Sequence, residues 1–290
     1  MSDLLHDLNL VRKLLPDIVR SKYYIRAKKG NFIDLWLTTV QNFQDKECLV
    51  MGKKSLSFND VDRVSNQIAN YLLSLGIKPK DTVCIMMENS PEFICTILGV
   101  AKVGAIGALL NYNLRVNPVL VIFENPFSSA IQSIHSNLKQ TFENLQFTLF
   151  NTENDLFNEE GFLINSFLSN KILKSISSRP VKEELRINSH FGEPYMYIYT
   201  SGTTGLPKAA VVPHAKAFSA AFLYSSNFSV QSTDRIYNCL PLYHSSGLLI
   251  GFGFTVRNGS TMIISKKFSA TSFWKECCES KATVVMVNPY

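Results

Sequence analysis

Apolar positions between residues 55 and 110 alternate between helical spacing and short continuous runs. Across 57–75 they recur every three to four residues, which predicts an amphipathic helix. Residues 82–87 form a short continuous apolar run, which predicts a buried strand. A second helix over 90–103 and a second strand over 105–110 repeat this order. Alternating helices and strands are typical of a parallel sheet covered by helices, so a layered α/β fold is predicted.

The best candidate for a transmembrane span runs from Phe93 to Leu110, with Lys102 as its sole charged residue. Its 18 residues would just suffice to cross a bilayer as a helix. Residues 89–92 read Asn-Ser-Pro-Glu, which supplies an N-cap, a proline for the first turn and an acid beside it. Lys102 and Gly104 suit the end of the same helix. These signals predict a helix that leads into a buried strand, and no transmembrane span.

Residues 111–195 have a less regular pattern. Asn125-Pro126 interrupts it, a helix is predicted from Ile131 to Phe142, and a strand from Gln146 to Phe150. A surface connection is predicted at Ser175–Pro180. Beyond these, the pattern predicts strands on both sides of 200–208, near Ile236–Leu240, at Thr261–Ser265 and at Thr283–Val287, and a helix near Ala215–Tyr224.

The composition is that of a globular domain, because 46% of the 290 residues are apolar and 18% are charged. Six cysteines are scattered without a Cys-x-x-Cys pair, and the vicinal Cys277-Cys278 does not suit a structural disulfide. Asp3, His6 and Asp7 interrupt any apolar leader at the start. Reduced thiols and an intracellular chain are therefore predicted.

The net charge of +6 lies entirely in residues 11–30, where seven lysines and arginines face Asp17 alone. Apolar residues in and before this stretch recur at helical spacing, although Pro16 limits the regularity of a helix. Two interpretations stay open, a basic amphipathic helix on an anionic membrane and a solvated helix packed on its own domain. Nucleic acid is not a predicted partner, because the remainder of the chain offers no basic stripe. Residues 1–30 are predicted to be a lead segment, and 31–290 the domain.

A polar loop, Thr200-Ser-Gly-Thr-Thr-Gly-Leu-Pro-Lys208, lies between two apolar runs. Gly202 and Gly205 expose backbone N–H groups, and small hydroxyl side chains add donors, which suits phosphate oxygens. Lys208 adds a compact cation for the same charge. The spacing differs from G-x-x-x-x-G-K-[ST], and residues 209–212 predict a strand instead of a helix. We expect a strand–loop–strand flap over a triphosphate; a merely flexible connection is the alternative.

The stretch Tyr199-Thr-Ser-Gly-Thr-Thr-Gly-Leu-Pro-Lys208 resembles the signature of adenylate-forming enzymes, namely acyl-CoA synthetases, luciferases and peptide-synthetase adenylation domains. Three further stretches are similar to fatty acid transport proteins, also called very long-chain acyl-CoA synthetases: Leu110–Arg115, Cys239–Gly247 and Lys266–Trp274. The similarity extends from about Phe43 to Thr283 and is weakest over 118–190. It implies the layered α/β N-terminal domain of an adenylate-forming enzyme.

The resemblance implies a two-step reaction with ATP, Mg²⁺ and coenzyme A, coupled to fatty acid uptake. A fatty acid carboxylate attacks the α-phosphorus of ATP to give acyl-adenylate and pyrophosphate, and coenzyme A then displaces AMP. By position, residues 200–205 would bind the β- and γ-phosphates, and Lys208 would offset their charge. The nucleotide-binding residues implied are Tyr199, Thr200, Ser201, Gly202, Thr203, Thr204, Gly205 and Lys208.

The resemblance also places His244 beside the acyl carboxylate as the catalytic residue, with Tyr243 and Gly247 lining the acyl pocket together with it. A histidine that only satisfies hydrogen bonds at a strand end is the alternative. Three aromatic residues at helical spacing are expected in the core instead of in a lipid channel: Phe268, Phe273 and Trp274.

Several parts of the family pattern are not found in this sequence: the Tyr-Gly-x-Thr-Glu motif whose acid helps to hold magnesium, the ribose-binding Asp, and the small C-terminal domain with its lysine. An incomplete N-terminal fragment, inactive alone, is therefore expected, and its metal ligands are unknown. Alternatives are a non-catalytic nucleotide-binding or regulatory module, or another acyl- or aryl-CoA ligase. The expected partners are a fatty acid and a membrane surface, reached through residues 1–30, at the endoplasmic reticulum, peroxisome or plasma membrane.

Overall fold

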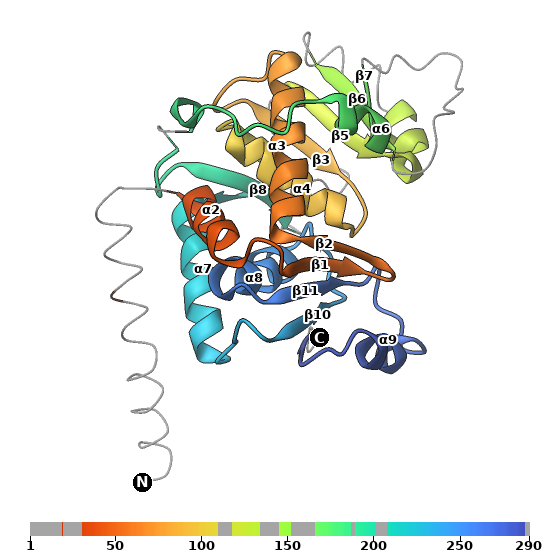
Figure 1. Ribbon diagram of the computed structural model, residues 1–290. Coiled ribbons are helices and arrows are strands. Elements are labelled where there is room, and N and C mark those ends of the chain that lie inside the picture. The colour runs from red at the N-terminus through yellow and green to blue at the C-terminus, as the bar shows by residue number, and fades with distance from the viewer. Residues whose placement is uncertain are drawn as a thin grey trace.

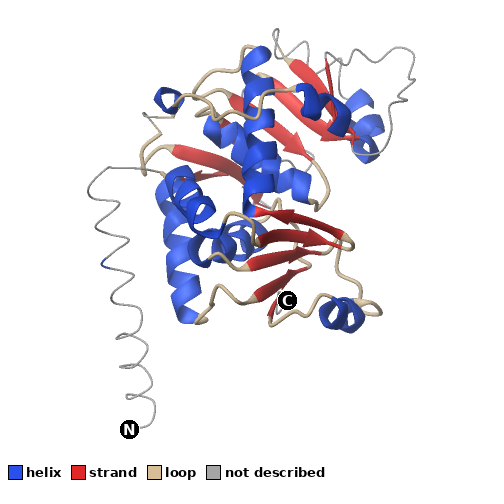
Figure 2. Ribbon diagram, in the orientation of Figure 1, coloured by secondary structure: helices blue, strands red, loops and turns tan. Residues whose placement is uncertain are grey.

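The computed structural model describes Val19 and residues 31–109, 118–133, 145–151, 166–186, 189–200 and 208–287. The lead segment apart from Val19, the polar loop 201–207 and most of the helix predicted over 131–142 lie outside the described residues. The described part consists of two β-sheets with helices around and between them (Figures 1 and 2). The α/β fold predicted from the sequence is confirmed.

The larger sheet has seven strands in the order β7-β6-β5-β3-β4-β8-β9. Its strands are β3 (Thr82–Met86), β4 (Ile106–Leu109), β5 (Leu120–Glu124), β6 (Gln146–Asn151), β7 (Ser166–Ser169), β8 (Pro194–Thr200) and β9 (Lys208–Pro213). Neighbours are parallel, except that β8 and β9 pair antiparallel on either side of the polar loop. Strands β3, β4 and β5 are buried nearly throughout, as is usual for parallel strands covered by helices.

The smaller sheet has five strands in the order β12-β10-β11-β1-β2. They are β1 (Glu47–Met51), β2 (Lys54–Ser57), β10 (Arg235–Asn238), β11 (Thr261–Ile264) and β12 (Val284–Met286). Strands β1 and β2 form a hairpin whose turn uses Gly52 at φ 57°. The other neighbours are parallel, so β1 pairs with β11, which lies about two hundred residues later in the chain.

The helices join the two sheets through one large core. They are α2 (Phe32–Phe43), α3 (Phe58–Ser74), α4 (Pro91–Lys102), α6 (Asn170–Ser175), α7 (His214–Asn227), α8 (Gly253–Asn258) and α9 (Phe273–Glu279), with 3₁₀ turns at Asn125–Phe127 and Glu183–Leu185, a π-helix η3 (Ser246–Phe252), and further helical residues at 128–133. Helices α3 and α4 run through the middle of the molecule (Figure 1). One buried cluster contains Leu49 of β1, Val83 of β3 and Trp36 of α2, so both sheets share this core.

Helix α4 occupies the stretch that was the candidate for a membrane span. Ser90 caps it, Pro91 starts it, and Gly104 follows it at φ 73°, as predicted. Lys102 in its last turn is buried and donates to Asp62 at 2.6 Å, and also to Ser65 and Asn66 of α3. Among the described helices, none is both long and apolar enough to cross a membrane.

The structure corrects one prediction of core residues. Phe268 is 58% exposed and Trp274 is 73% exposed, so neither belongs to the core. Only Phe273 is partly buried, against Tyr237 of β10. Phe268 lies in the loop before α9, and Phe273 and Trp274 are consecutive residues at the start of this short helix, so the three rings do not share one helix face.

Candidate active site

Several strands of the larger sheet end at one edge. Because β3, β4, β5 and β8 are parallel, Met86, Glu124 and Thr200 lie at the same, carboxyl end of the sheet. Thr200 pairs directly opposite Lys208, so the polar loop emerges from this edge as the connection of an antiparallel hairpin. Ligands of open α/β sheets bind at the carboxyl ends of strands. The predicted strand–loop–strand arrangement is therefore confirmed at the two ends of the loop.

The structure describes only part of the predicted nucleotide-binding set. Ser201, Gly202, Thr203, Thr204 and Gly205 lie outside the described residues. Lys208 is exposed at the start of β9. Tyr199 is buried at 4% exposure in a cluster with Cys84 and Phe123, so its ring helps to support the base of the hairpin.

A cavity of about 410 Å³ opens at the same edge, where the two sheets meet. The residues that line it are Met86, Met87, Glu88, Asn89, Phe127, Cys239, Leu240, Pro241, Tyr243, Lys266, Lys267 and Phe268. Most of these walls are apolar, which suits a hydrophobic ligand. Tyr243, predicted from the sequence to line an acyl pocket, is among them.

His244 and Gly247, also predicted for the acyl pocket, are part of the turn next to this cavity, but neither is among the residues that line it. His244 is exposed, and the centroid of its ring lies 4.6 Å from that of Tyr243. Its backbone N–H donates to the carbonyl of Pro241 at 3.1 Å, and its own carbonyl accepts from Leu248. Gly247 is buried, and a methyl group there would lie 2.5 Å from the carbonyl oxygen of Pro241. Gly247 thus allows the start of η3 to approach the turn closely.

Asn89 fixes this turn to the end of β3. Its side-chain amide donates to the carbonyls of Leu240 and Ser265 at 3.0 and 3.1 Å, and its side-chain oxygen accepts from the N–H of Leu242 at 2.8 Å. Asn89 is buried at 7% exposure. The sequence suggested only a helix cap at 89–92, and Ser90 is the residue that caps α4. Asn89 therefore connects the two sheets beneath Tyr243 and His244.

An acidic residue at the end of β5 was also missed from the sequence. Glu124 accepts a hydrogen bond from the backbone N–H of Glu88 at 2.8 Å, and Glu88 forms an ion pair with Lys266 at 2.8 Å. Burial, opposed by that hydrogen bond, raises the pKa of Glu124 from 4.5 to about 7. The signal for Glu124 was available, since an acid directly follows the apolar run Leu-Val-Ile-Phe.

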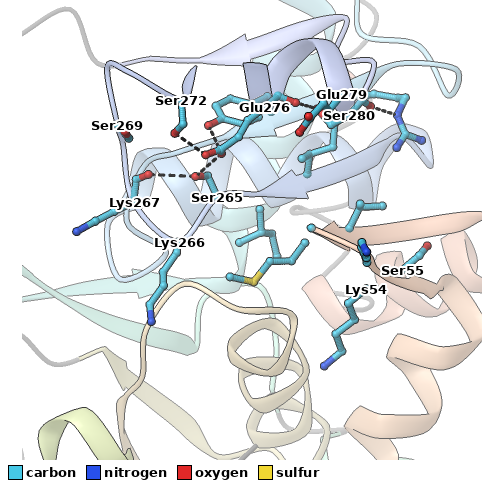
Figure 3. A pocket seen from close by; sticks show the side chains of 18 of the residues that line it. Lys54, Ser55, Ser265, Lys266, Lys267, Ser269, Ser272, Glu276, Glu279 and Ser280 are labelled. Carbon is cyan, nitrogen blue, oxygen red and sulfur yellow. Dashed lines mark hydrogen bonds between the residues drawn. The ribbon is translucent and has the colours of Figure 1, made fainter. Parts of the chain in front are cut away.

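A second, larger hollow of about 1230 Å³ lies over the face of the smaller sheet (Figure 3). Lysine and serine side chains surround it, and several polar groups already bind one another. Glu276 accepts from Tyr237, Ser265 and Ser272, and Arg235 pairs with Glu47 at 2.6 Å. Several of its polar groups thus bind one another within the wall, whereas most residues that line the smaller cavity are apolar.

The cofactors implied by the resemblance can be compared with these residues. The hydroxyl, backbone amide and ammonium groups of residues 200–208 can donate hydrogen bonds to phosphate oxygens, so their chemistry fits a nucleotide. In the part of the chain that the structure describes, no group of three or more His, Cys, Asp or Glu side chains could hold a metal ion. All six cysteines are free, and five of them are buried, as expected of reduced thiols.

Comparison with known proteins gives a consistent result. The profile of the AMP-binding enzyme family matches residues 37–290. Long-chain fatty acid transport protein 1 of Homo sapiens is 37% identical over 239 residues, which cover 79% of this chain and 36% of that protein. Long-chain fatty acid transport protein 6 of Homo sapiens is 32% identical over 281 residues, covering 96% of this chain and 45% of that protein. The chain therefore spans less than half the length of these curated relatives.

Solved structures show the same fold. The inhibitor-bound N-terminal domain of FACL13 from Mycobacterium tuberculosis superposes with a TM-score of 0.71 at 23% identity, covering 88% of this chain and 62% of that one. The anthranilate CoA ligase AuaEII in complex with anthranoyl-AMP gives a TM-score of 0.76 at 21% identity, covering 88% and 49%. The resemblance to fatty acid transport proteins inferred from the sequence is confirmed, and the chain belongs to the AMP-binding enzyme family.

Proposed function

We propose that the chain forms the nucleotide- and acyl-binding part of a fatty acid–CoA ligase, which activates long or very long-chain fatty acids through an acyl-adenylate and supports their uptake. The observation that carries this proposal is the position of the β8–β9 hairpin. Its polar loop leaves the larger sheet at the edge where the apolar cavity opens. An anionic nucleotide and an apolar acyl chain can then meet at one place.

The loop residues have the role of binding phosphates. Backbone and hydroxyl donors of residues 200–205 would bind the β- and γ-phosphates, with Tyr199 supporting the hairpin beneath them. Lys208 would offset the phosphate charge from the opposite strand. ATP supplies the activated phosphorus when it is bound, and Mg²⁺, whose protein ligands are unknown, would neutralise charge on its phosphates.

The turn 240–247 has the role of orienting the acyl group. Tyr243 would line the apolar cavity, and His244, beside it, would face the carboxylate at the cavity mouth. Gly247 would keep η3 close enough to hold this turn in place. Coenzyme A would be the second substrate, and the thioester its product.

Two features outside the site complete the proposal. Residues 1–30 form a basic lead segment that contacts a membrane surface, and residues 31–290 form the AMP-binding domain. An intracellular membrane, of the endoplasmic reticulum or peroxisome, or the inner face of the plasma membrane is the proposed location. A non-catalytic nucleotide-binding module is the alternative, in which ATP binds but no adenylate forms.

Calorimetric titration with ATP tests the assignment of the loop. Replacing Lys208→Ala should weaken ATP binding about ten- to a hundredfold, because a charged hydrogen bond contributes roughly 1.5–3 kcal/mol. Lys216→Ala is the matched control, since Lys216 is an exposed lysine a few residues later on α7. Equal ATP affinity in the parent chain and the Lys208→Ala variant would refute the assignment. Fatty-acid-dependent pyrophosphate exchange by this chain would rule out the non-catalytic module, whereas no exchange is the result expected of a fragment that is inactive alone.

A further inference from the structure

Three aromatic rings cluster at the surface between β11 and α9. Phe273 packs edge-on against Tyr237, with ring centroids 5.5 Å apart. On its outer side, the centroids of Phe268 and Trp274 lie 5.8 and 5.0 Å from that of Phe273. Trp274 is 73% exposed, the largest exposed fraction among the exposed large hydrophobic side chains of the described residues. Large apolar side chains that are exposed as a group, instead of singly, are typical of an interaction surface.

The cluster is held on a fixed support. The carboxylate of Glu276 on α9 accepts hydrogen bonds from the hydroxyls of Tyr237 at 2.8 Å, Ser265 at 2.9 Å and Ser272 at 2.6 Å (Figure 3). These bonds, that from Ser272 most of all, keep the pKa of Glu276 below its ordinary value. One ionised carboxylate thus ties α9 to β10 and to both ends of the loop 265–272. The loop and the helix that carry the aromatic rings are therefore held in place by these hydrogen bonds.

Lysines flank the rings on both sides. Lys266 and Lys267 immediately precede Phe268, and Lys275 immediately follows Trp274. The side chains of Lys266 and Lys275 are 61% and 75% exposed. In Figure 3, Lys266 and Lys267 extend away from Glu276. Residues 266–281 contain four lysines and two glutamates, so the segment is positively charged overall.

This combination fits a lipid surface better than a protein partner. Protein–protein interfaces are enriched in aromatic residues but depleted in lysine. At the boundary of a bilayer, tryptophan lies among the headgroups, while lysine places its stem in the apolar layer and its ammonium beside anionic phosphates. Helix α9 also lies at the periphery of the molecule, where a flat surface can reach it (Figures 1 and 2).

We propose that an aromatic–lysine patch docks the protein on an anionic membrane surface, with Phe268 and Trp274 inserted among the lipid headgroups. The patch consists of Lys266, Lys267, Phe268, Phe273, Trp274 and Lys275. Three of its members, Lys266, Lys267 and Phe268, also line the 410 Å³ apolar cavity. Docking therefore turns the cavity toward the bilayer. Entry of a fatty acid by this route rests on the proposed function, whereas docking itself does not.

Tryptophan fluorescence of the 290-residue chain tests the proposal. The chain has two tryptophans, and the other one, Trp36, is fully buried, so changes on docking report Trp274. With vesicles of phosphatidylcholine and phosphatidylserine, the emission should shift to shorter wavelength. Phosphatidylcholine brominated on its acyl chains should quench it. Trp274→Phe should abolish both changes.

Vesicle partitioning measures the contribution of single side chains. Trp274→Ser should lower the partition coefficient about tenfold, and Lys267→Gln about fivefold. Phe228→Ser is the matched control, because Phe228 is 63% exposed on another surface, and it should leave the partition coefficient unchanged. Thermal unfolding confirms that each variant is folded.

Three outcomes would overturn the proposal. The first is vesicle-bound protein whose emission neither shifts nor is quenched, which would mean that another segment, such as 1–30, makes the contact. The second is an absence of vesicle binding. The third is an emission that is already at short wavelength without vesicles and moves to longer wavelength on dilution, which would assign the patch to a second copy of the chain. Loss of ATP binding by Lys208→Ala changes none of these readouts, so the two proposals fail independently.

Discussion

At the scale of single residues, Glu124 near the proposed site has a carboxylate whose ionised form is disfavoured by its surroundings. It is partly buried at the end of β5 and lies close to two further carboxylates, Glu88 and Glu92, with Lys266 as the nearby cation. Burial and these acids favour its protonated form, whereas the N–H of Glu88 and the ammonium of Lys266 favour the carboxylate. Burial is the largest effect, so its pKa is raised to about 7.

This raised pKa makes the stability of the protein depend on pH. Between pH 4.5 and about 7, the folded state binds more protons at Glu124 than the unfolded state does, so the free energy of unfolding falls as pH rises through this window. Glu124→Gln removes the penalty and should stabilise the protein by about 2–3 kcal/mol near pH 8, with little effect near pH 5. Urea unfolding at both pH values measures this difference.

The control for this prediction is Glu183→Gln, because Glu183 is an exposed acid in a 3₁₀ turn. It should leave the pH dependence as in the parent protein. An unchanged pH dependence in Glu124→Gln would show that Glu124 is already ionised at low pH in the folded state. The Gln side chain can still accept the hydrogen bond from Glu88, so loss of that bond does not confuse the result.

Single residues also mark the limit of inference from sequence. Lys102 was correctly placed in the last turn of a helix, but sequence did not show that its ammonium is buried among Asp62, Ser65 and Asn66. Tyr243 was correctly placed beside an apolar cavity. Asn89, whose three partners lie about 150 to 180 residues away, could not be recognised because such contacts depend on how the two sheets meet.

At the scale of elements, prediction succeeded where the signals are local. Helix α4 carries its cap, its first-turn proline and its terminal glycine within its own sequence, and its limits were predicted within one or two residues. Other local signals were present but unused, such as the capping box of Asn31 and Asp34 before α2 and the Gly52 turn of the β1–β2 hairpin. The parallel pairing of β1 with β11 has no local signal at all.

The exposure of Trp274 has a similar explanation. The helical spacing inferred from the sequence was wrong for Phe268, which lies in the loop before α9, and spacing alone does not show what covers a helix face. Helix α9 has seven residues, and Cys277 is the only buried one among them. The ring of Phe273 reaches the sheet, while its neighbours point outward.

The π-helix η3 depends on one glycine for its position. Gly247→Ala should destabilise the protein by about 1–3 kcal/mol, because its methyl group would meet the carbonyl of Pro241 at 2.5 Å and force backbone to move. Gly251→Ala is the matched control in the same helix, since its nearest contact, to a flexible methionine side chain, would be 3.4 Å. Urea unfolding should separate the two variants. Equal free energies of unfolding for both variants would show that the turn 240–244 can move away from the added methyl group without loss of stability.

At the scale of the whole molecule, Asn89 is the main polar link described between the end of the larger sheet and the turn of the smaller one. Asn89→Ala should lower the free energy of unfolding by about 2–4 kcal/mol, because it leaves the buried N–H of Leu242 and the carbonyl of Ser265 without their partner, while the carbonyl of Leu240 keeps only its bond from Asn238. Chemical denaturation measures this loss.

A second asparagine provides the comparison. The amide of Asn70 also donates to three backbone carbonyls, but two of those bonds are exposed to solvent. Water can replace them, so Asn70→Ala should cost about 1 kcal/mol or less. If the two variants lose equal stability, the bonds of Asn89 do not hold the sheets together.

The lead segment and the aromatic–lysine patch together determine how the whole molecule would meet a membrane. A chain that starts at Asn31 retains the N-cap of α2 and should keep the melting temperature of the full chain. It lacks seven lysines and arginines and three aspartates, so its formal net charge falls from +6 to +2 and its binding to anionic vesicles should fall more than tenfold. Added salt should release the full chain, because the screening length shortens from about 10 Å at 0.1 M to about 3 Å at 1 M.

Cosedimentation with anionic vesicles, with neutral phosphatidylcholine vesicles as the control, measures this loss. What binding remains should still shift the emission of Trp274, since the patch lies in the domain and not in the lead segment. Residues 1–30 would then attract the molecule electrostatically, and the patch would fix its orientation by apolar insertion. If the shortened chain cosediments as well as the full one, the lead segment is not an anchor, and the charge of residues 11–30 serves another purpose.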